Sequence, residues 1–219
     1  CLQELLDHDI PVFENVLGPC VVFGDEGLHT ADEPGGAPKR IGNGVFSRLH
    51  VSKFGSEYYV GSLAHAQVNE QKEYLTDLCV SWADVEMNAD TFRFMTTHFT
   101  WTPDGSASDD QRRNLSALLD TLKNMGEFVL SGDFNAPRIH KGTKGEIFGM
   151  LAATYTDNIP KRYESTLDPV LHRAAPLSYV VDGLFSTSAY EVSNVNVIGG
   201  LSDHMAILAT ISKRASNNQ

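Results

Sequence analysis

The stretch 109–126 constrains the fold most, because it carries a helix signal together with both of its ends. Ser108 and Gln111 form the pattern of a capping box at its start, and Gly126 suits the position just past its end. The apolar residues recur at helical spacing and predict one face that packs on a core: Leu115, Leu118, Leu119, Leu122 and Met125. An apolar strand is expected directly afterwards, over 127–130. The chain should therefore combine helices with sheets in an α/β (α+β) fold.

Short strands are predicted in quick succession before this helix, separated by polar turns. They cover 44–47, 58–64, 76–85 and 91–99, and such close spacing favours antiparallel neighbours. After the helix we expect strands over 178–185 and 205–211 and a weaker helix over 145–155. Residues 24–44 are rich in glycine, proline and charge, which predicts a long surface loop.

Composition and charge are those of one ordinary globular domain. The 219 residues are 42% hydrophobic and 21% charged, and no apolar run approaches the ~20 residues of a membrane-spanning helix. A net charge of −11 argues against a protein that coats nucleic acid, although it leaves room for a nuclease whose carboxylates bind metal. The three cysteines are far apart in apolar settings, which predicts buried thiols and slightly favours the reducing cytoplasm. We expect a monomer.

Asp133 and Asn135 follow the strand expected at 127–130, in the sequence Gly-Asp-Phe-Asn. Residues two apart point the same way from an extended segment, so this carboxylate and amide can share one hard cation and one phosphate oxygen. Phe134 would point the opposite way and anchor the loop in the core. The alternative is a plain turn, because Gly, Asp and Asn are the usual turn formers. The first interpretation indicates metal-assisted phosphoester chemistry.

Asp182 interrupts an otherwise apolar strand, so its carboxylate must be either exposed at an edge or paired internally. His204 is the natural partner, since an Asp–His pair fixes the imidazole tautomer and raises its basicity. On its own, His204 beside Asp203 would be a surface or capping residue. Its coexistence with Asp133 and Asp182 makes it a candidate for the same site.

The remaining candidates carry less information. His98 closes a predicted strand and is either a site residue or an ordinary rim histidine. Taken individually, Glu4 and Glu73 give no indication of a functional role. Arg138 begins a basic run over 138–144, which is either a solvated loop or a site for a second phosphate or a polyanion.

Taken in chain order, these motifs resemble those of the endonuclease/exonuclease/phosphatase superfamily of metal-dependent phosphoesterases. The resemblance covers nearly the whole chain, and its motifs are specific only in combination. They are Leu2-Gln3-Glu4, residues 42–48, Thr97-His98-Phe99, Gly132-Asp133-Phe134-Asn135, Val181-Asp182-Gly183 and Ser202-Asp203-His204. The resemblance implies a single domain over 1–219, a four-layer sandwich of two mixed, largely antiparallel β-sheets flanked by helices.

The resemblance also implies a metal and the groups that bind it. Glu4 would be the principal ligand of Mg²⁺ or Mn²⁺, and Asp203 would contribute to a metal site. Asp133 would orient or deprotonate the attacking water, and Asn135 would bind the scissile phosphate. The metal would polarise a phosphoryl oxygen while water attacks in line.

Three further residues take roles by the same resemblance. His204, held by Asp182, would donate to the phosphate or act in proton transfer. His98 would lie opposite and stabilise the transition state or the leaving oxygen. Glu73 would orient His98.

Two features depart from the family pattern. A first β-strand with a site asparagine precedes Leu2-Gln3-Glu4 in the family and is expected to be missing here. An aromatic residue usually follows the site aspartate, where this chain has Gly183. The substrate therefore stays open: a phosphodiester of nucleic acid is the first candidate, and a lipid or inositol phosphoester is the alternative. A catalytically inactive binding module, or a scaffold with accidental motifs, would belong to another class.

Overall fold

The computed structural model describes residues 1–29, 39–63, 77–139, 142–173 and 177–215. The chain divides into two compact units, Cys1–Thr100 with Asn114–Gly126 and Trp101–Arg113 with Glu127–Gln219. Within the described ranges, no helix is long and apolar enough to cross a membrane.

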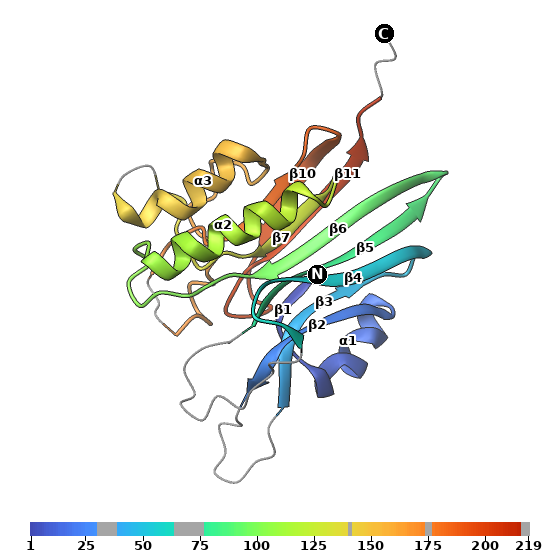
Figure 1. The fold of residues 1–219 in the computed structure, drawn as a ribbon, viewed down its shortest axis with the longest axis horizontal. Coiled ribbons are helices and arrows are strands. Elements are labelled where there is room, and N and C mark those ends of the chain that lie inside the picture. Colours follow the sequence, from blue (N-terminus) through green and yellow to red (C-terminus); the bar gives the residue numbers. More distant parts are fainter. Residues whose placement is uncertain (30–38, 64–76, 140–141, 174–176, 216–219) are drawn as a thin grey trace. The chain divides into compact units, whose positions relative to one another are not determined.

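The first unit is built from two sets of three antiparallel strands (Figure 1). One set has the order β1-β3-β2, and in the other β4, β5 and β6 pair consecutively. The bounds are β1 Leu2–Leu6, β2 Cys20–His29, β3 Lys39–Phe46, β4 Val51–Val60, β5 Leu78–Met87 and β6 Asp90–His98. The predicted antiparallel pairing of neighbouring strands is confirmed, although β3 and β4 begin earlier than expected.

The sequence does not predict the segment that joins β1 to β2. It forms a short 3-10 helix, η1 (Asp7–Asp9), and the helix α1 (Ile10–Leu17). No residue of α1 is buried, and Val12 and Val16 are both 64% exposed. With eight residues, α1 is shorter than the stretch over which a helical periodicity can be recognised in a sequence.

The prediction of a surface loop over 24–44 is wrong for the described part of that stretch. β2 continues to His29 and β3 starts at Lys39, and the two strands pair with each other. Glycine serves close packing here, because a Cβ built on Gly42 would lie 1.9 Å from the backbone oxygen of Gly24. A glycine-rich composition is thus compatible with a strand where another backbone approaches closely.

One face of β5 changes from polar to apolar along its length. Cys79 and Ser81 are fully buried, and further along the same face Ala83 and Val85 join a small apolar cluster with Val45. The polar end also holds the buried Glu26 of β2 and Asn43 of β3, with 2.8 Å from Asn43 Nδ2 to Glu26 Oε1. The interior of this unit is therefore partly held by hydrogen bonds rather than by apolar contact alone.

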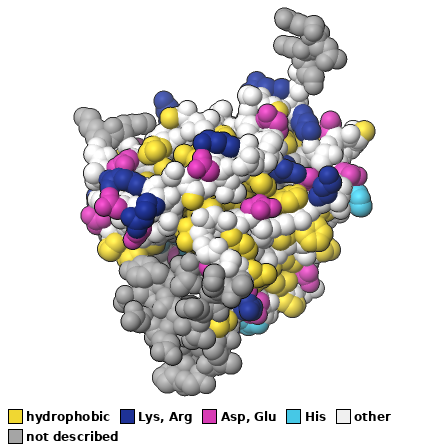
Figure 2. Space-filling view, in the orientation of Figure 1, with side chains coloured by type: hydrophobic (Ala, Val, Ile, Leu, Met, Phe, Trp, Pro, Cys, Tyr) yellow, Lys and Arg dark blue, Asp and Glu magenta, His cyan; other side chains and the backbone are white. Residues whose placement is uncertain are grey.

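The helix predicted over 109–125 is confirmed as α2 (Asp109–Lys123). Ser108 Oγ accepts a hydrogen bond of 3.1 Å from the backbone N–H of Gln111, and Gly126 has φ +71°. Four apolar residues of the expected stripe are buried: Leu115, Leu118, Leu122 and Met125. On the solvent side basic and acidic side chains lie next to one another (Figure 2), as in the pair of Lys123 and Asp120.

In the second unit three antiparallel strands have the order β7-β9-β8. The strands β10 and β11 form a hairpin (Figure 1). The bounds are β7 Val129–Asp133, β8 Thr156–Asp157, β9 Asp182–Ser186, β10 Tyr190–Ile198 and β11 Ala206–Lys213. A 3-10 turn, η3 (Thr143–Gly145), leads into α3 (Glu146–Thr154), which confirms the weaker predicted helix. The sequence does not predict β8 or β10.

Candidate active site

Asp133 at the end of β7 and Asp182 at the start of β9 are direct partners in the antiparallel register. Each residue is only 7% exposed. Like charges placed opposite each other on neighbouring strands destabilise a sheet, and burial increases that cost. The pair therefore needs a positive group close to both carboxylates.

His204 supplies such a group. Its Nδ1 lies 2.9 Å from Asp182 Oδ2, and its Nε2 lies 3.8 Å from Asp133 Oδ2. Burial by itself lowers the pKa of His204, but the hydrogen bond to Asp182 and the neighbouring carboxylates outweigh it and raise the pKa to about 9. In the metal-free protein His204 is thus an imidazolium at neutral pH, with Nδ1–H directed at Asp182.

Thr166 fixes the position of Asp182 relative to the segment that carries His204. Its side-chain oxygen accepts hydrogen bonds of 3.1 Å from the backbone N–H groups of Val181 and Asp182. Its carbonyl accepts a bond of 2.6 Å from the N–H of Met205, the residue after His204. Thr166 is fully buried. No motif marks it in the sequence, because its role depends on contacts with residues 15 or more positions away.

Asn135 and Asp133 form a turn at the end of β7. The backbone N–H of Asn135 donates to Asp133 Oδ1 at 2.7 Å, and Asn135 has φ +49°. Asparagine tolerates this left-handed backbone better than most residues. One carboxylate oxygen thus shapes the turn, while the other faces His204. The turn interpretation is confirmed, and the extended geometry assumed from the sequence does not reach Asn135, because β7 ends at Asp133. The role of the two side chains at a site stays a prediction.

Phe134 anchors this turn, as the sequence predicts. It is fully buried, and its ring packs edge-on against Phe185 with centroids 5.2 Å apart. Gly183 makes room for it, since a Cβ there would lie 2.6 Å from the Phe134 ring. The glycine that departs from the family pattern therefore has a packing reason in this chain.

Glu4 and His98 lie together in the first unit. Glu4 Oε1 is 3.6 Å from His98 Nε2; the glutamate side chain is 67% exposed, whereas that of His98 is 9% exposed. Glu4 has φ +50° where the register of β1 shifts between Leu2 and Leu5. A non-glycine residue held in this region stores strain, and such strain is frequent at functional sites.

Gln3 fixes the strand next to this strained residue. Its Nε2 donates a hydrogen bond of 2.5 Å to the hydroxyl of Thr96, which is fully buried in β6. The bond ties β1 to the strand that ends at His98, so the local structure holds the two side chains near each other.

The other predicted residues fall into three cases. Asp203 is exposed, accepts a hydrogen bond from Ser202 Oγ, and offers a carboxylate oxygen close to a ring nitrogen of His204. Arg138 is turned inward: its guanidinium donates to Asp157 Oδ2 at 3.1 Å and to the carbonyl of Tyr163 at 2.8 Å. That charge stabilises the loop after β8 instead of facing a ligand. Glu73 lies outside the described residues.

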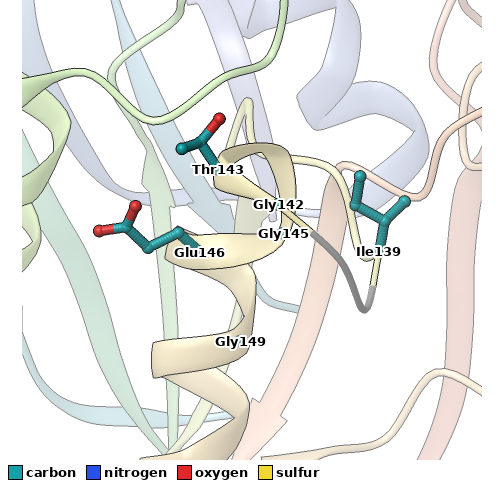
Figure 3. A pocket seen from close by; sticks show the side chains of 6 residues that line it. All are labelled: Ile139, Gly142, Thr143, Gly145, Glu146 and Gly149. Atoms are coloured by element: carbon teal, nitrogen blue, oxygen red, sulfur yellow. The ribbon is translucent and has the colours of Figure 1, made fainter.

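An open hollow of about 530 Å³ lies at the start of α3, near Ile139 and Glu146 (Figure 3). Three glycines line much of it: Gly142, Gly145 and Gly149. None of the predicted site residues lines it. Glu146 is paired there with Arg112 at 2.7 Å, so we assign the hollow no chemistry.

Two groups of side chains could hold a metal ion among the described residues. Asp133, Asp182 and His204 bring one ligand atom each within 4.8 Å of one another. His172, Asp203 and His204 form a second such group, and the sequence gives no sign of His172 as a site residue. In the first unit Glu4 offers an exposed carboxylate. Carboxylates with an imidazole are a donor set that suits divalent cations.

Comparison with known proteins agrees with the resemblance found in the sequence. The model of the endonuclease/exonuclease/phosphatase family matches residues 1–204. A search of curated proteins finds no match to this chain.

Solved structures of similar fold have low sequence identity to this chain. A mannosyl-6-phosphatase of Bacteroides thetaiotaomicron is 13% identical with a TM-score of 0.61, over 96% of this chain and 83% of that one. The catalytic domain of human nocturnin, with a bound sulfate, is 15% identical with a TM-score of 0.63, over 98% and 80%. A humanised Danio rerio TDP2 is 15% identical with a TM-score of 0.60, over 97% and 84%. These similarities confirm the predicted fold class.

Proposed function

Because this chain belongs to the endonuclease/exonuclease/phosphatase family, whose members are hydrolases of phosphoester bonds, we propose that it hydrolyses a phosphodiester with Mg²⁺ or Mn²⁺. The observation that carries the proposal is the placement of His204 between Asp182 and Asp133, with 2.9 Å and 3.8 Å to the two carboxylates. A histidine that one carboxylate orients and another faces is arranged for proton transfer.

Each residue of the second unit then has a defined task. Asp133 orients the attacking water and accepts its proton through Oδ2, the oxygen that faces His204. Asn135 binds the scissile phosphate through its amide. His204, protonated and fixed by Asp182, donates to a phosphoryl oxygen or to the leaving group. Fixed donors at developing charge lower the barrier most when they need no reorganisation.

Glu4 and His98 complete the proposal from the first unit. The exposed carboxylate of Glu4 is the principal metal ligand there. In the second unit, Asp203 contributes to a metal site. The bound ion would polarise a phosphoryl oxygen and neutralise charge on the leaving oxygen. His98, whose Nε2 faces Glu4 at 3.6 Å, stabilises charge near that ion.

Nucleic acid is our first substrate class, and a lipid or inositol phosphoester is the second. The second has support of its own. The net charge is −11, Arg138 is paired internally, and the exposed basic groups of α2 are paired with acidic ones. A polyanion gains affinity from unpaired cations along its path. A small phosphoester needs fewer of them.

A substrate screen tests the proposal. The protein is incubated with Mg²⁺ or Mn²⁺ and single-stranded DNA, nicked DNA, RNA, sphingomyelin and inositol phosphates, each with an EDTA control. Asp133→Asn and His204→Ala should lose turnover of whichever substrate reacts. Asp104→Asn, an exposed loop aspartate of the same unit, is the matched control. Turnover that does not depend on metal would refute the proposed mechanism. No turnover of any phosphoester would refute the enzymatic function and favour a binding module.

A further inference from the structure

His172 lies against the proposed catalytic histidine. The rings of His172 and His204 meet edge to face, with centroids 5.9 Å apart and an interplanar angle of 70°. Asp203, next in the chain to His204, completes a group in which one ligand atom from each residue lies within 4.8 Å of the others. This group is distinct from the pair of Asp133 and Asp182, although it shares His204.

Asp168 holds His172 in this place. Its Oδ1 accepts hydrogen bonds of 2.9 Å from the backbone N–H groups of Val170 and Leu171, and its Oδ2 accepts one of 2.7 Å from Gly200. Its carbonyl accepts a bond of 3.1 Å from the N–H of His172. One buried carboxylate thus ties the turn that carries His172 to the turn that precedes Asp203.

A second bond connects the same two segments. The backbone N–H of Asp168 donates to the carbonyl of Asp203 at 2.8 Å, and Leu167 forms a β-bridge with His204. His172 and Asp203 are therefore fixed at their backbones close to His204. An arrangement of this kind is preorganised, because the ligand segments need no large movement to reach a common ion.

Two imidazoles and one carboxylate favour Zn²⁺ or a similar transition metal ion, whereas oxygen ligands alone favour Mg²⁺. Mg²⁺ prefers oxygen, whereas Zn²⁺ and its neighbours bind imidazole nitrogen with carboxylate oxygen and leave a fourth position open. With bonds of ~2.0–2.2 Å, tetrahedral ligand atoms lie about 3.3–3.5 Å apart. The ligand atoms now lie within 4.8 Å of one another, so binding requires small movements of the exposed Asp203 and the half-buried His172 side chains.

His204 is also presented in the way that metal-binding histidines are. Its Nδ1 is engaged by Asp182, which leaves Nε2 as the ligand atom. A carboxylate behind a ligand histidine fixes the ring and makes the free nitrogen a better donor. The same nitrogen faces Asp133 at 3.8 Å and carries the proton in the proposed reaction.

We propose that His172, Asp203 and His204 form a binding site for a transition metal ion of the Zn²⁺ class, and that its occupation inhibits the enzyme. The inhibition rests on the proposed function, whereas the binding site does not. Binding of the ion at Nε2 of His204 releases the proton of that nitrogen to solvent, so the imidazole can no longer donate it to the phosphate. Zn²⁺ at this site therefore competes with the reaction.

The binding arm of the test uses untagged full chain and no substrate. Zn²⁺ affinity and stoichiometry are measured by titration calorimetry, and Co²⁺ is added separately to record its visible absorption in a four-coordinate site. We expect His172→Ala and Asp203→Asn to lose one ion per chain or to bind it at least tenfold more weakly. The control His50→Ala, an exposed histidine of the first unit, should bind like the wild type. Equal binding by His172→Ala and the wild type would overturn the site.

The inhibition arm measures each variant against its own rate with Mg²⁺ alone. Zn²⁺ should inhibit the wild type and His50→Ala, and inhibition of His172→Ala should need at least tenfold more Zn²⁺. Equal sensitivity of all variants would overturn the inhibition. Thermal melting of each variant without metal shows whether it is folded, and a folded Asp203→Asn keeps the binding arm valid if His172→Ala is not folded. A protein that binds Zn²⁺ here but hydrolyses no phosphoester would refute the proposed function alone.

Discussion

His204 Nδ1 lies 2.9 Å from Asp182 Oδ2, and this contact determines which ring nitrogen faces Asp133. The two residues come from motifs 22 positions apart. Their meeting depends on Thr166, which holds the backbone of Asp182 and of the residue after His204. The pair is the structural unit on which the proposed proton transfer depends.

Substitution of this pair should reduce turnover without additivity. Asp182→Asn removes the charge that orients His204, and we expect kcat to fall by about 10²–10⁴, the usual worth of a general acid or base. His204→Ala should cost a similar factor. The double variant should be little worse than either single one, because the two residues act as a unit. Asp104→Asn is the control, and additive losses in steady-state kinetics would show that the residues act separately.

Glu4 should lower the stability of the protein through its backbone strain, while its carboxylate supports metal-dependent turnover. Its φ of +50° costs a non-glycine residue about 1–3 kcal/mol, and glycine adopts this region freely. We therefore expect Glu4→Gly to be more stable to urea than Glu4→Ala by about 1 kcal/mol. Both variants lack the carboxylate and should lose metal-dependent turnover. If Glu4→Ala is as stable as Glu4→Gly, the strain is not stored at this residue.

Gly183 should not tolerate a side chain. A Cβ there would lie 2.5 Å from the ring of Phe185 and 2.6 Å from that of Phe134. Overpacking of this kind costs about 1–3 kcal/mol, so Gly183→Ala should lower the free energy of unfolding and displace the Asp133 turn. Gly149→Ala is the matched control, because nothing lies within 4 Å of its Cβ position in α3. There alanine should stabilise by about 0.5–1 kcal/mol. Equal unfolding midpoints for the two variants would contradict this packing.

Glu26 should make the stability of the first unit depend on pH. Burial raises its pKa well above the ordinary value of 4.5, against the lowering effect of hydrogen bonds from Cys79 and Asn43. Its Oε2 has no hydrogen-bond partner within the described ranges. The folded protein therefore holds a proton that the unfolded chain releases above pH 4.5. The resulting stabilisation is complete below that pH and is lost as pH rises towards the folded pKa.

Glu26→Gln separates this effect from other titrations. In that window the wild type should lose up to about 1.4 kcal/mol of unfolding free energy per pH unit relative to Glu26→Gln. Urea unfolding of both proteins between pH 4 and 9 measures the difference. Glu57→Gln, at an exposed position of β4, should follow the wild type. Parallel curves for Glu26→Gln and the wild type would show that Glu26 is ionised in the folded protein.

The sequence predicts those parts of the site that depend on local patterns. Phe134 between Asp133 and Asn135 follows from alternation along a strand, and α2 follows from its cap and its leucine spacing. Thr166 and His172 are not predictable in this way. Their roles depend on hydrogen bonds and ring contacts with residues far along the chain. The strand β2 is missed for another reason: its glycines serve close packing, but their composition is that of a loop.

The central claim is that this chain uses Asp133 in a metal-dependent hydrolysis. The most direct measurement is the initial rate on the best substrate from the screen, or on bis(4-nitrophenyl) phosphate, as a function of Mg²⁺ concentration. The wild type should show saturable Mg²⁺ dependence that EDTA abolishes, and Asp133→Asn, which keeps the shape of the side chain, should be at least about 10²-fold slower. A wild-type rate that does not depend on metal, or an Asp133→Asn rate equal to it, would contradict the account.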